Sequence, residues 1–159
     1  MKDLDIKSIG KREMIVESKD LNTTNVINFN NNLLKTGRES LAASLANEIG
    51  NSYDFFISRM IFGDGGTLDS VPKYVNYDRT GLFGITKTSK AVISTIDPNL
   101  KSQVIFTCIL DYNDDSNGNV LNEMALQMNN GKIYSMATFA DLNKTSSIQI
   151  TWNWKISFI

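Results

Sequence analysis

The sequence predicts a mainly β protein: an antiparallel β-sandwich with one short helix near residues 37–49 and an N-terminal arm. The first observation is the alternation of apolar and polar residues along 148–158, which places Trp152 and Trp154 on the same side. This period of two is typical of a strand with one buried face. The second is a series of β-type segments separated by tight turns, which favours antiparallel pairing. The third is the single segment of helical periodicity.

Length and composition predict the domain organisation. A chain of 159 residues, 42% of them hydrophobic, is long enough to bury one core. We expect residues 31–159 to form a single β-sandwich domain. Residues 1–30 are expected to form an N-terminal arm or strand, and an arm there could tie neighbouring subunits together.

Charge and residue usage argue against several function classes. The net charge of −1 gives no long-range attraction for polyanions, so we expect no nucleic-acid partner. The chain contains no histidine, the commonest general base and metal ligand, so we expect no enzyme activity, metal or cofactor. The first residues are charged and no apolar run is long enough to span a membrane. This predicts synthesis and folding in a cytoplasm, with no membrane partner.

The predicted helix follows a polar stretch. Residues 12–19 could form a short strand, and the Asn-rich residues 22–32 are expected to form a loop. Thr36 and Glu39 match a capping box, apolar residues recur at helical spacing behind them, and Gly50 sits where a C-terminal cap belongs. Because its apolar stripe is narrow and rich in alanine, the helix should lie close against a sheet.

A strand predicted at 55–62 leads into a long irregular stretch, residues 63–84. This stretch holds five of the ten glycines. Loops of this length are uncommon and tend to be functional or to contact partners. We select from it seven residues expected to shape the loop or to form an interface, with no catalytic role: Gly63, Asp64, Gly65, Gly66, Thr67, Arg79 and Phe83.

The second half of the chain is predicted to consist of strands joined by turns. Turn sequences occur at 97–99, at 114–119, which contains Asn-Gly, and at 129–131. The strands between and around them are expected at 90–96, 102–112, 121–128, 132–139 and 147–159.

Two motifs invite ligand-binding interpretations. Residues 63–66, Gly-Asp-Gly-Gly, follow a strand as phosphate loops do. They lack the Gly-Lys-Ser/Thr ending, and a turn that needs positive φ is the better interpretation. Residues 113–120 are similar to the first half of a calcium loop, but Met124 stands where a bidentate Glu is expected. A calcium ion in the 111–120 turn is kept as the alternative to a plain hairpin turn.

Other polar residues have structural interpretations. Asp78 and Arg79 could belong to an ion-pair network, but no second carboxylate can be assigned to them for acid–base chemistry. Cys108 lies in an apolar run and is expected to be a buried thiol. Glu123 alternates with Met124 and is therefore expected to face water or a partner, whereas the methionines fill the core.

The tryptophans allow a rival interpretation. Trp152 or Trp154 could form a platform on which a sugar stacks, as in a carbohydrate-binding β-sandwich module. That function requires at least one of them to be exposed. Burial of both in the core is the simpler expectation.

Five short segments occur in a recognisable order. A capped Gly-Arg-Glu-Ser-Leu-Ala helix is followed by a strand ending in Phe-Gly-Asp-Gly-Gly-Thr and by Arg-Thr-Gly-Leu-Phe-Gly. An Asn-Glu-Met-Ala strand and the alternating C-terminal strand come next. The segments occupy residues 32–42, 57–67, 79–84, 122–125 and 148–158. Together they resemble small structural virion proteins of tailed bacteriophages, of the tail, baseplate, collar or fibre-base type.

The resemblance covers about residues 30–159 and implies a non-enzymatic building block with a β-sandwich body. Such a protein would assemble in multiple copies in the tail, baseplate or collar and dock neighbouring virion proteins or fibres. It would be made in the host bacterial cytoplasm, reside in the virion and form a homo-oligomer within a symmetric assembly. A capsid decoration protein is one alternative and the carbohydrate-binding module is another. A carboxylate-only hydrolase is the least favoured.

Overall fold

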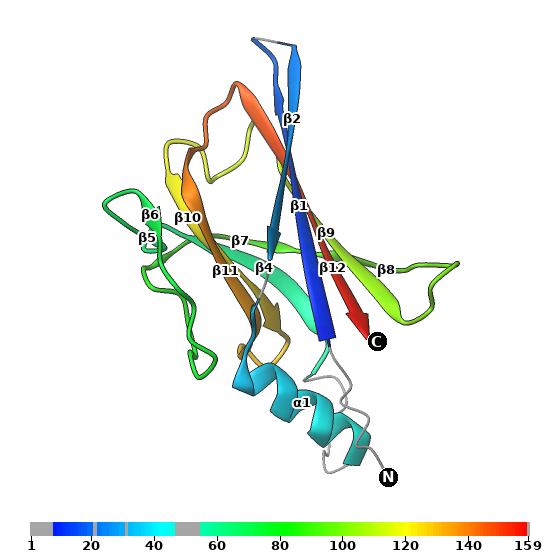
Figure 1. The fold of residues 1–159 in the computed structure, drawn as a ribbon. Helices are drawn as coiled ribbons and strands as arrows, with labels where there is room; N and C mark the ends of the chain where they lie inside the picture. Colours follow the sequence, from blue (N-terminus) through cyan, green and yellow to red (C-terminus); the bar gives the residue numbers. More distant parts are fainter. Residues whose placement is uncertain (1–7, 21, 31, 47–54, 159) are drawn as a thin grey trace.

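The computed structural model describes residues 8–20, 22–30, 32–46 and 55–158. Within these residues two five-stranded antiparallel sheets pack against each other, and one helix lies at one end of them (Figure 1). Sheet A has the strand order β2-β1-β12-β9-β8, and sheet B has the order β3-β11-β10-β4-β7. The predicted antiparallel β-sandwich with one short helix is confirmed.

Most of the described chain lies in these two sheets. Sheet A contains β1 (Ser8–Ser18), β2 (Thr23–Asn30), β8 (Ile93–Ile96), β9 (Gln103–Leu110) and β12 (Ile148–Phe158). Sheet B contains β3 (Asn32–Leu33), β4 (Ile57–Gly63), β7 (Thr86–Ala91), β10 (Val120–Met128) and β11 (Ile133–Asn143). Helix α1 (Lys35–Ala46) and a small hairpin of β5 (Thr67–Leu68) and β6 (Val71–Pro72) complete the fold.

The C-terminal strand β12 lies in the middle of sheet A, between β1 and β9. Its alternate residues point between the sheets, where Trp152 and Trp154 have 0% exposed surface. The Trp152 ring packs against Phe62 of β4 and Phe139 of β11, with centroid distances of 5.6 and 5.1 Å. Alternation in the sequence therefore identifies the buried face correctly: both indoles lie in the core, and Trp152 joins the two sheets.

Part of the outer face of sheet B is also buried. On β10, Met124 and Leu126 belong to the core between the sheets, whereas Ala125 belongs to a second apolar cluster on the opposite face. Residues 64–85, including the β5–β6 hairpin, run beside this face (Figure 1) and supply Leu82 and other side chains that pack against the cluster. The buried members of the second cluster are Leu34, Ile61, Val75, Ala125, Ile133 and Met136.

Helix α1 begins at Lys35, and the predicted capping box does not form. Thr36 lies inside the first turn, and its hydroxyl donates a hydrogen bond to the carbonyl of Ile133 on β11. A Cβ atom on Gly37 would collide with the backbone carbonyl of Tyr134, so the helix lies directly against β11, as expected. Tertiary contact with the sheet has replaced local capping. The predicted helix end at 49 and the cap at Gly50 lie outside the described residues.

The predicted loop at 22–32 is wrong. Strand β2 covers most of this range and pairs antiparallel with β1, so that both strands belong to sheet A. The side chains from Thr23 to Asn28 are all exposed. A strand at a sheet edge that is exposed on both faces shows no apolar alternation, so its Asn-rich composition looks like that of a loop.

The single strand predicted at 90–96 is two strands in different sheets. β7 pairs with β4 in sheet B, and β8 pairs with β9 in sheet A. The chain therefore passes from one sheet to the other near Val92, whose side chain packs against the core between them. Both parts are extended, so residue types alone do not show where the crossing occurs.

Candidate functional site

Glu123 on β10 has 0% exposed surface and lies beneath residues 64–85. Its Oε1 atom accepts hydrogen bonds from the backbone amides of Gly65 (2.9 Å) and Gly84 (2.8 Å). Its Oε2 atom accepts one from the backbone amide of Phe83 (2.6 Å). Charge-assisted bonds of this kind offset the loss of hydration of a buried carboxylate. One side chain thus holds the two ends of the long loop together.

The expectation that Glu123 faces water or a partner is wrong. Its side chain does lie on the face of β10 opposite Met124, as alternation predicts. That face is covered by a loop from another part of the chain. Alternation along a strand predicts which residues share a face, but it does not show what packs on that face.

Asn122 extends this site toward the β5–β6 hairpin. Its Oδ1 atom accepts a hydrogen bond from the amide of Gly66 (2.6 Å), and its Nδ2 donates to Thr67 Oγ1 and Asp141 Oδ1 (2.9 Å each). The pairing of β10 with β11 shifts register between Leu121 and Glu123, and a shift of this kind changes the direction of neighbouring side chains. We call Asn122, Glu123 and the amides of Gly65, Gly66, Phe83 and Gly84 the loop anchor.

The hydrogen bonds also affect the exposed carboxylate at the margin of the anchor. Asp141 accepts from Asn122 and from the hydroxyl of Thr67, the latter at 2.8 Å. These two bonds, the one from Asn122 first, lower the pKa of the Asp141 carboxyl. The charged form is therefore the one that fits the network.

The glycines at the anchor allow backbone segments to approach each other more closely than a side chain would permit. A Cβ atom on Gly65 would collide with the backbone of Gly84, and one on Gly66 would collide with the carbonyl of Asn122. The predicted positive φ at residues 63–66 is wrong, because within the described chain the positive-φ glycines lie elsewhere, in later turns. Here glycine allows two backbone segments to come into contact. Glycine also occurs where φ must be positive, and the sequence alone does not distinguish these two uses.

The other sequence-selected residues surround the anchor. Gly63 precedes it so closely that a Cβ atom there would lie 2.6 Å from the Glu123 carboxylate. Asp64 forms an ion pair with Lys87 of β7 at 2.8 Å. The residues chosen at 63–67 and at 83 therefore lie at opposite ends of the loop and meet in space. Their partners Asn122 and Glu123 were missed as site residues, because nothing local marks them as the acceptors for a loop 40 to 60 residues away.

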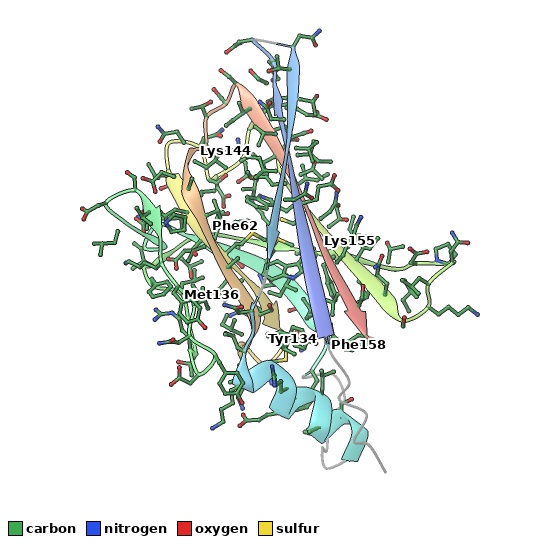
Figure 2. The ribbon with its side chains drawn as sticks, viewed as in Figure 1. Phe62, Tyr134, Met136, Lys144, Lys155 and Phe158 are labelled. Atoms are coloured by element: carbon green, nitrogen blue, oxygen red, sulfur yellow. The ribbon has the colours of Figure 1, made fainter. Side chains whose placement is uncertain are left out.

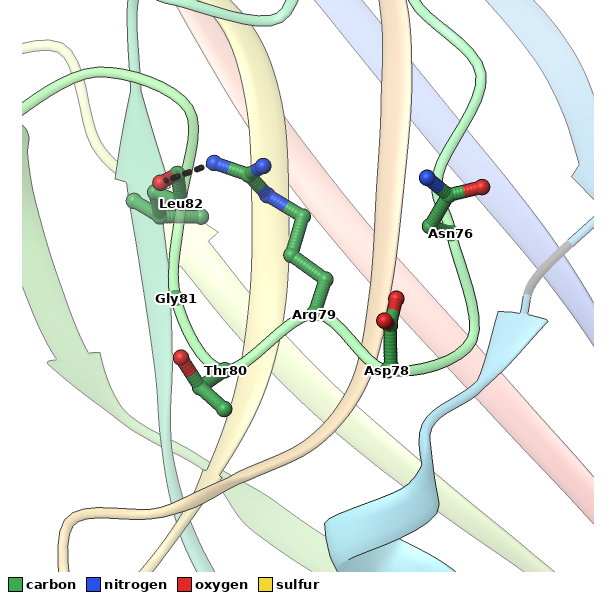
Figure 3. A pocket seen from close by; sticks show the side chains of 6 residues that line it. All are labelled: Asn76, Asp78, Arg79, Thr80, Gly81 and Leu82. Atoms are coloured by element: carbon green, nitrogen blue, oxygen red, sulfur yellow. Dashed lines mark hydrogen bonds between the residues drawn. The ribbon is translucent and has the colours of Figure 1, made fainter.

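Arg79 does not pair with Asp78. Its guanidinium lies over the Phe83 ring, 3.5 Å from the centroid, and Nη2 donates to the carbonyl of Leu82 at 2.7 Å. Figure 3 shows the guanidinium turned toward Leu82 at the edge of an open, polar hollow formed by this turn. Arg79 thus closes the last turn of the loop before the anchor.

A second loop is organised around a buried cation. Lys144, just after β11, has 0% exposed surface. Its ammonium group donates to the carbonyls of Asp111 (2.8 Å) and Thr145 (2.9 Å) and to Asn117 Oδ1 (2.6 Å). Burial lowers the pKa of this group, and nearby Asp114 and Asp111 oppose the shift. Figure 2 shows Lys144 at the end of sheet B away from α1.

This arrangement bears on the calcium interpretation of residues 111–120. Oxygen atoms of the turn converge on the Lys144 ammonium, so a lysine side chain supplies positive charge there. No group of three or more acidic or thiol side chains in the described ranges could hold a metal ion. The carboxylates of Asp114 and Asp115 instead bind Lys90 of β7, at 3.0 and 2.7 Å. The oxygen atoms of the turn thus bind lysine side chains of the chain itself. Nothing in the local sequence distinguishes Lys144 from an ordinary loop lysine.

The burial of Trp152 and Trp154 removes the sugar-platform hypothesis, which required one exposed indole. Cys108 is also buried, and burial raises its thiol pKa to about 12. The thiol therefore stays protonated and packs as a small apolar group, as expected. In the part of the chain that the structure describes, no helix is long and apolar enough to cross a membrane.

Comparison of the chain with protein-family models, with curated proteins and with solved structures found no match.

Proposed function

We propose that this chain is a non-enzymatic structural protein of a tailed-phage virion, present in multiple copies in the tail, baseplate or collar. It would dock neighbouring virion proteins or fibres. The observation that supports this proposal is the loop anchor. Segments 57–67, 79–84 and 122–125, three of the five that carry the resemblance to such proteins, meet there through four hydrogen bonds.

The chemistry of the anchor suits a mechanical role. Both oxygens of Glu123 already accept backbone hydrogen bonds, so this carboxylate holds the chain in place. The glycines allow the close contacts that the bonds require. The backbone amides, the glycines and the two acceptor side chains of the three segments thus act together in shaping one loop.

The β5–β6 hairpin of the loop exposes apolar side chains and is held to sheet B by hydrogen bonds. The amide of Lys73 donates to the carbonyl of Gly66 (2.8 Å), and the hydroxyl of Thr138 donates to the carbonyl of Lys73 (2.7 Å). The first bond closes the β5–β6 hairpin, and the second ties it to β11 of sheet B. Beyond them Leu68 and Val71 are 66% and 65% exposed. Exposed apolar side chains on an ordered support are typical of protein-contact sites, so we assign docking to this hairpin.

The test uses particles of the phage that encodes the chain. Mass spectrometry of purified particles should find the chain in many copies, and labelled particles viewed by electron microscopy should show it in the tail, baseplate or collar. A location on the capsid surface would support the decoration-protein alternative. Particles that lack the chain would contradict the proposal.

The docking assignment has its own test. A Leu68→Ser/Val71→Ser double variant should fold with unchanged thermal stability, because both side chains are exposed, yet enter particles less often. The control is Ile109→Ser, which removes an apolar side chain of 49% exposure from sheet A. Equal incorporation of the double variant and the control would reject the hairpin as the docking element.

A further inference from the structure

The edges of the two sheets differ in how they are protected. An edge strand exposes unpaired N–H and C=O groups, and proteins usually guard it by shortness, lysine, proline or a covering segment. In sheet B, β3 has two residues and β7 carries Lys87 and Lys90. In sheet A, β8 has four residues. Only β2, among the edges of the two large sheets in the described chain, is both long and uncharged.

Strand β2 has eight residues, Thr23–Asn30, with neither a charged side chain nor a proline. One of its edges is fully used, since it pairs with β1 from Thr23 to Asn30. Within the described ranges sheet A ends at β2, so its other edge offers backbone groups to a further strand. Val26 and Ile27 are 52% and 43% exposed.

We propose that β2 is where a second copy of this chain attaches: two β2 strands pair antiparallel across a two-fold axis and join two A sheets into one. The inference rests on the proposed function for the choice of a second copy as the partner. A strand without charges can face itself, because no like charges then lie opposite each other. The same pairing through β7 would bring lysines together. A two-fold axis needs only one self-complementary surface, and β2 supplies it.

The registry of sheet A limits how the two strands can meet. Val26 pairs with Ile15, which pairs with Thr151 on the outer face of the sheet. Ile27 pairs with Met14, whose side chain faces the core. A two-fold axis perpendicular to the sheet keeps each face on its own side, so Val26 or Ile27 can lie opposite its own counterpart but not opposite each other. Either register covers an apolar side chain on each face.

The experiment measures the mass of the full chain by analytical ultracentrifugation. The wild type should sediment as a dimer or a multiple of it. Val26→Lys should weaken dimerisation at least 100-fold, because it places an ammonium group on each β2. The matched control is Thr151→Lys, which adds the same charge in the same cross-strand row but in the middle of the sheet. It should leave the dimer intact.

A second measurement covers the case in which Val26→Lys fails to fold. Asn25, Val26, Ile27 and Asn28 are each replaced by cysteine, and the chain is oxidised. One of the four should form a disulfide-linked dimer efficiently and so identify the register, since paired Cβ atoms across antiparallel strands come close enough for a disulfide. Cys108 is buried and does not interfere. Thr151→Cys should not cross-link.

Several outcomes would overturn the inference. These are a monomeric wild type, a dimer that survives Val26→Lys, equal loss of the dimer in Val26→Lys and Thr151→Lys, and the lack of any cross-link at residues 25–28. A chain that is monomeric alone but abundant in phage particles would reject self-pairing through β2 and leave the virion role standing. A chain that dimerises through β2 but is missing from particles would do the reverse.

Discussion

The two faces of strand β10 are buried by different kinds of interaction. On the inner face Met124, Leu126 and Met128 pack into the apolar core between the sheets. On the outer face Glu123 binds three backbone amides of a loop, and Ala125 packs beneath the same loop. Apolar packing tolerates many sequences of similar volume, whereas a buried charge requires donors at defined positions. The inner face therefore gives the fold its stability, and the outer face gives one loop its shape.

Removing a side chain from the core between the two sheets (the inner layer) should have the largest effect on stability. Trp152→Ala should lower the free energy of unfolding by about 3–5 kcal/mol, because a buried indole between Phe62 and Phe139 is lost and a cavity is left. Urea unfolding followed by circular dichroism measures the change. Ile109→Ala, on the exposed side of sheet A, should change it by less than about 1 kcal/mol. Similar losses for the two variants would show that the sheet interface is not the main source of stability.

A substitution in the loop anchor on the outer face of sheet B (the outer layer) should destabilise mainly the loop that it holds. Glu123→Gln keeps the shape of the side chain but leaves one oxygen and an NH2 group to face three N–H donors, so at least one buried amide loses its acceptor. We expect a loss of about 2–3 kcal/mol. Hydrogen exchange should accelerate at Gly65, Phe83 and Gly84 more than in β12. Asp141→Asn, the same chemical change at an exposed site, should leave those amides protected. Uniform acceleration throughout the chain would contradict the division between the two layers.

Sequence reasoning succeeds for the inner layer for a physical reason. Burial on one face of a strand leaves a period of two, and that period is visible along β12. Sequence reasoning fails at β2, because both faces of this strand are exposed and its sequence therefore shows no alternation of apolar and polar residues. The clustered glycines of the loop mark it in the sequence, although the positive φ predicted for residues 63–66 is not observed.

The partners of that loop were not predictable in the same way. Glu123 and Lys144 are single charged residues in ordinary surroundings, and all their hydrogen-bond partners except Thr145 lie about 30 to 60 residues away. Their burial follows from the packing of whole segments, which no local pattern reports. The helix start shows the same limit, because contact with Tyr134 and Ile133 overrides the local capping box.

Lys144 offers a test of whether a buried cation shapes its loop as the carboxylate does. Lys144→Met keeps the length of the side chain and removes three hydrogen bonds. We expect the free energy of unfolding to fall by about 1–2 kcal/mol. This loss is smaller than for Glu123→Gln, because the carbonyl oxygens that lose their donor can bind water more easily than the buried amides of the loop anchor can. Amides of Asp114 to Asn119 should exchange faster. Lys101→Met, an exposed lysine, is the control; an equal effect there would remove the special role of Lys144.

The inner layer should also impose a pH dependence through Cys108. Burial raises the thiol pKa from 9.0 to about 12. Above pH 9 the unfolded chain loses this proton while the folded chain keeps it, so the folded state binds more protons and its stability falls as the pH rises. The wild type should lose about 1.4 kcal/mol of unfolding free energy from this group between pH 8 and pH 10. Cys108→Ala should be less stable at pH 8 because of the lost packing, but it should lack this part of the decline, so the difference between the two proteins should shrink as the pH rises. Parallel curves for the two proteins would mean that the thiol is accessible to water, and that the layer between the sheets is less dry than its tryptophans indicate.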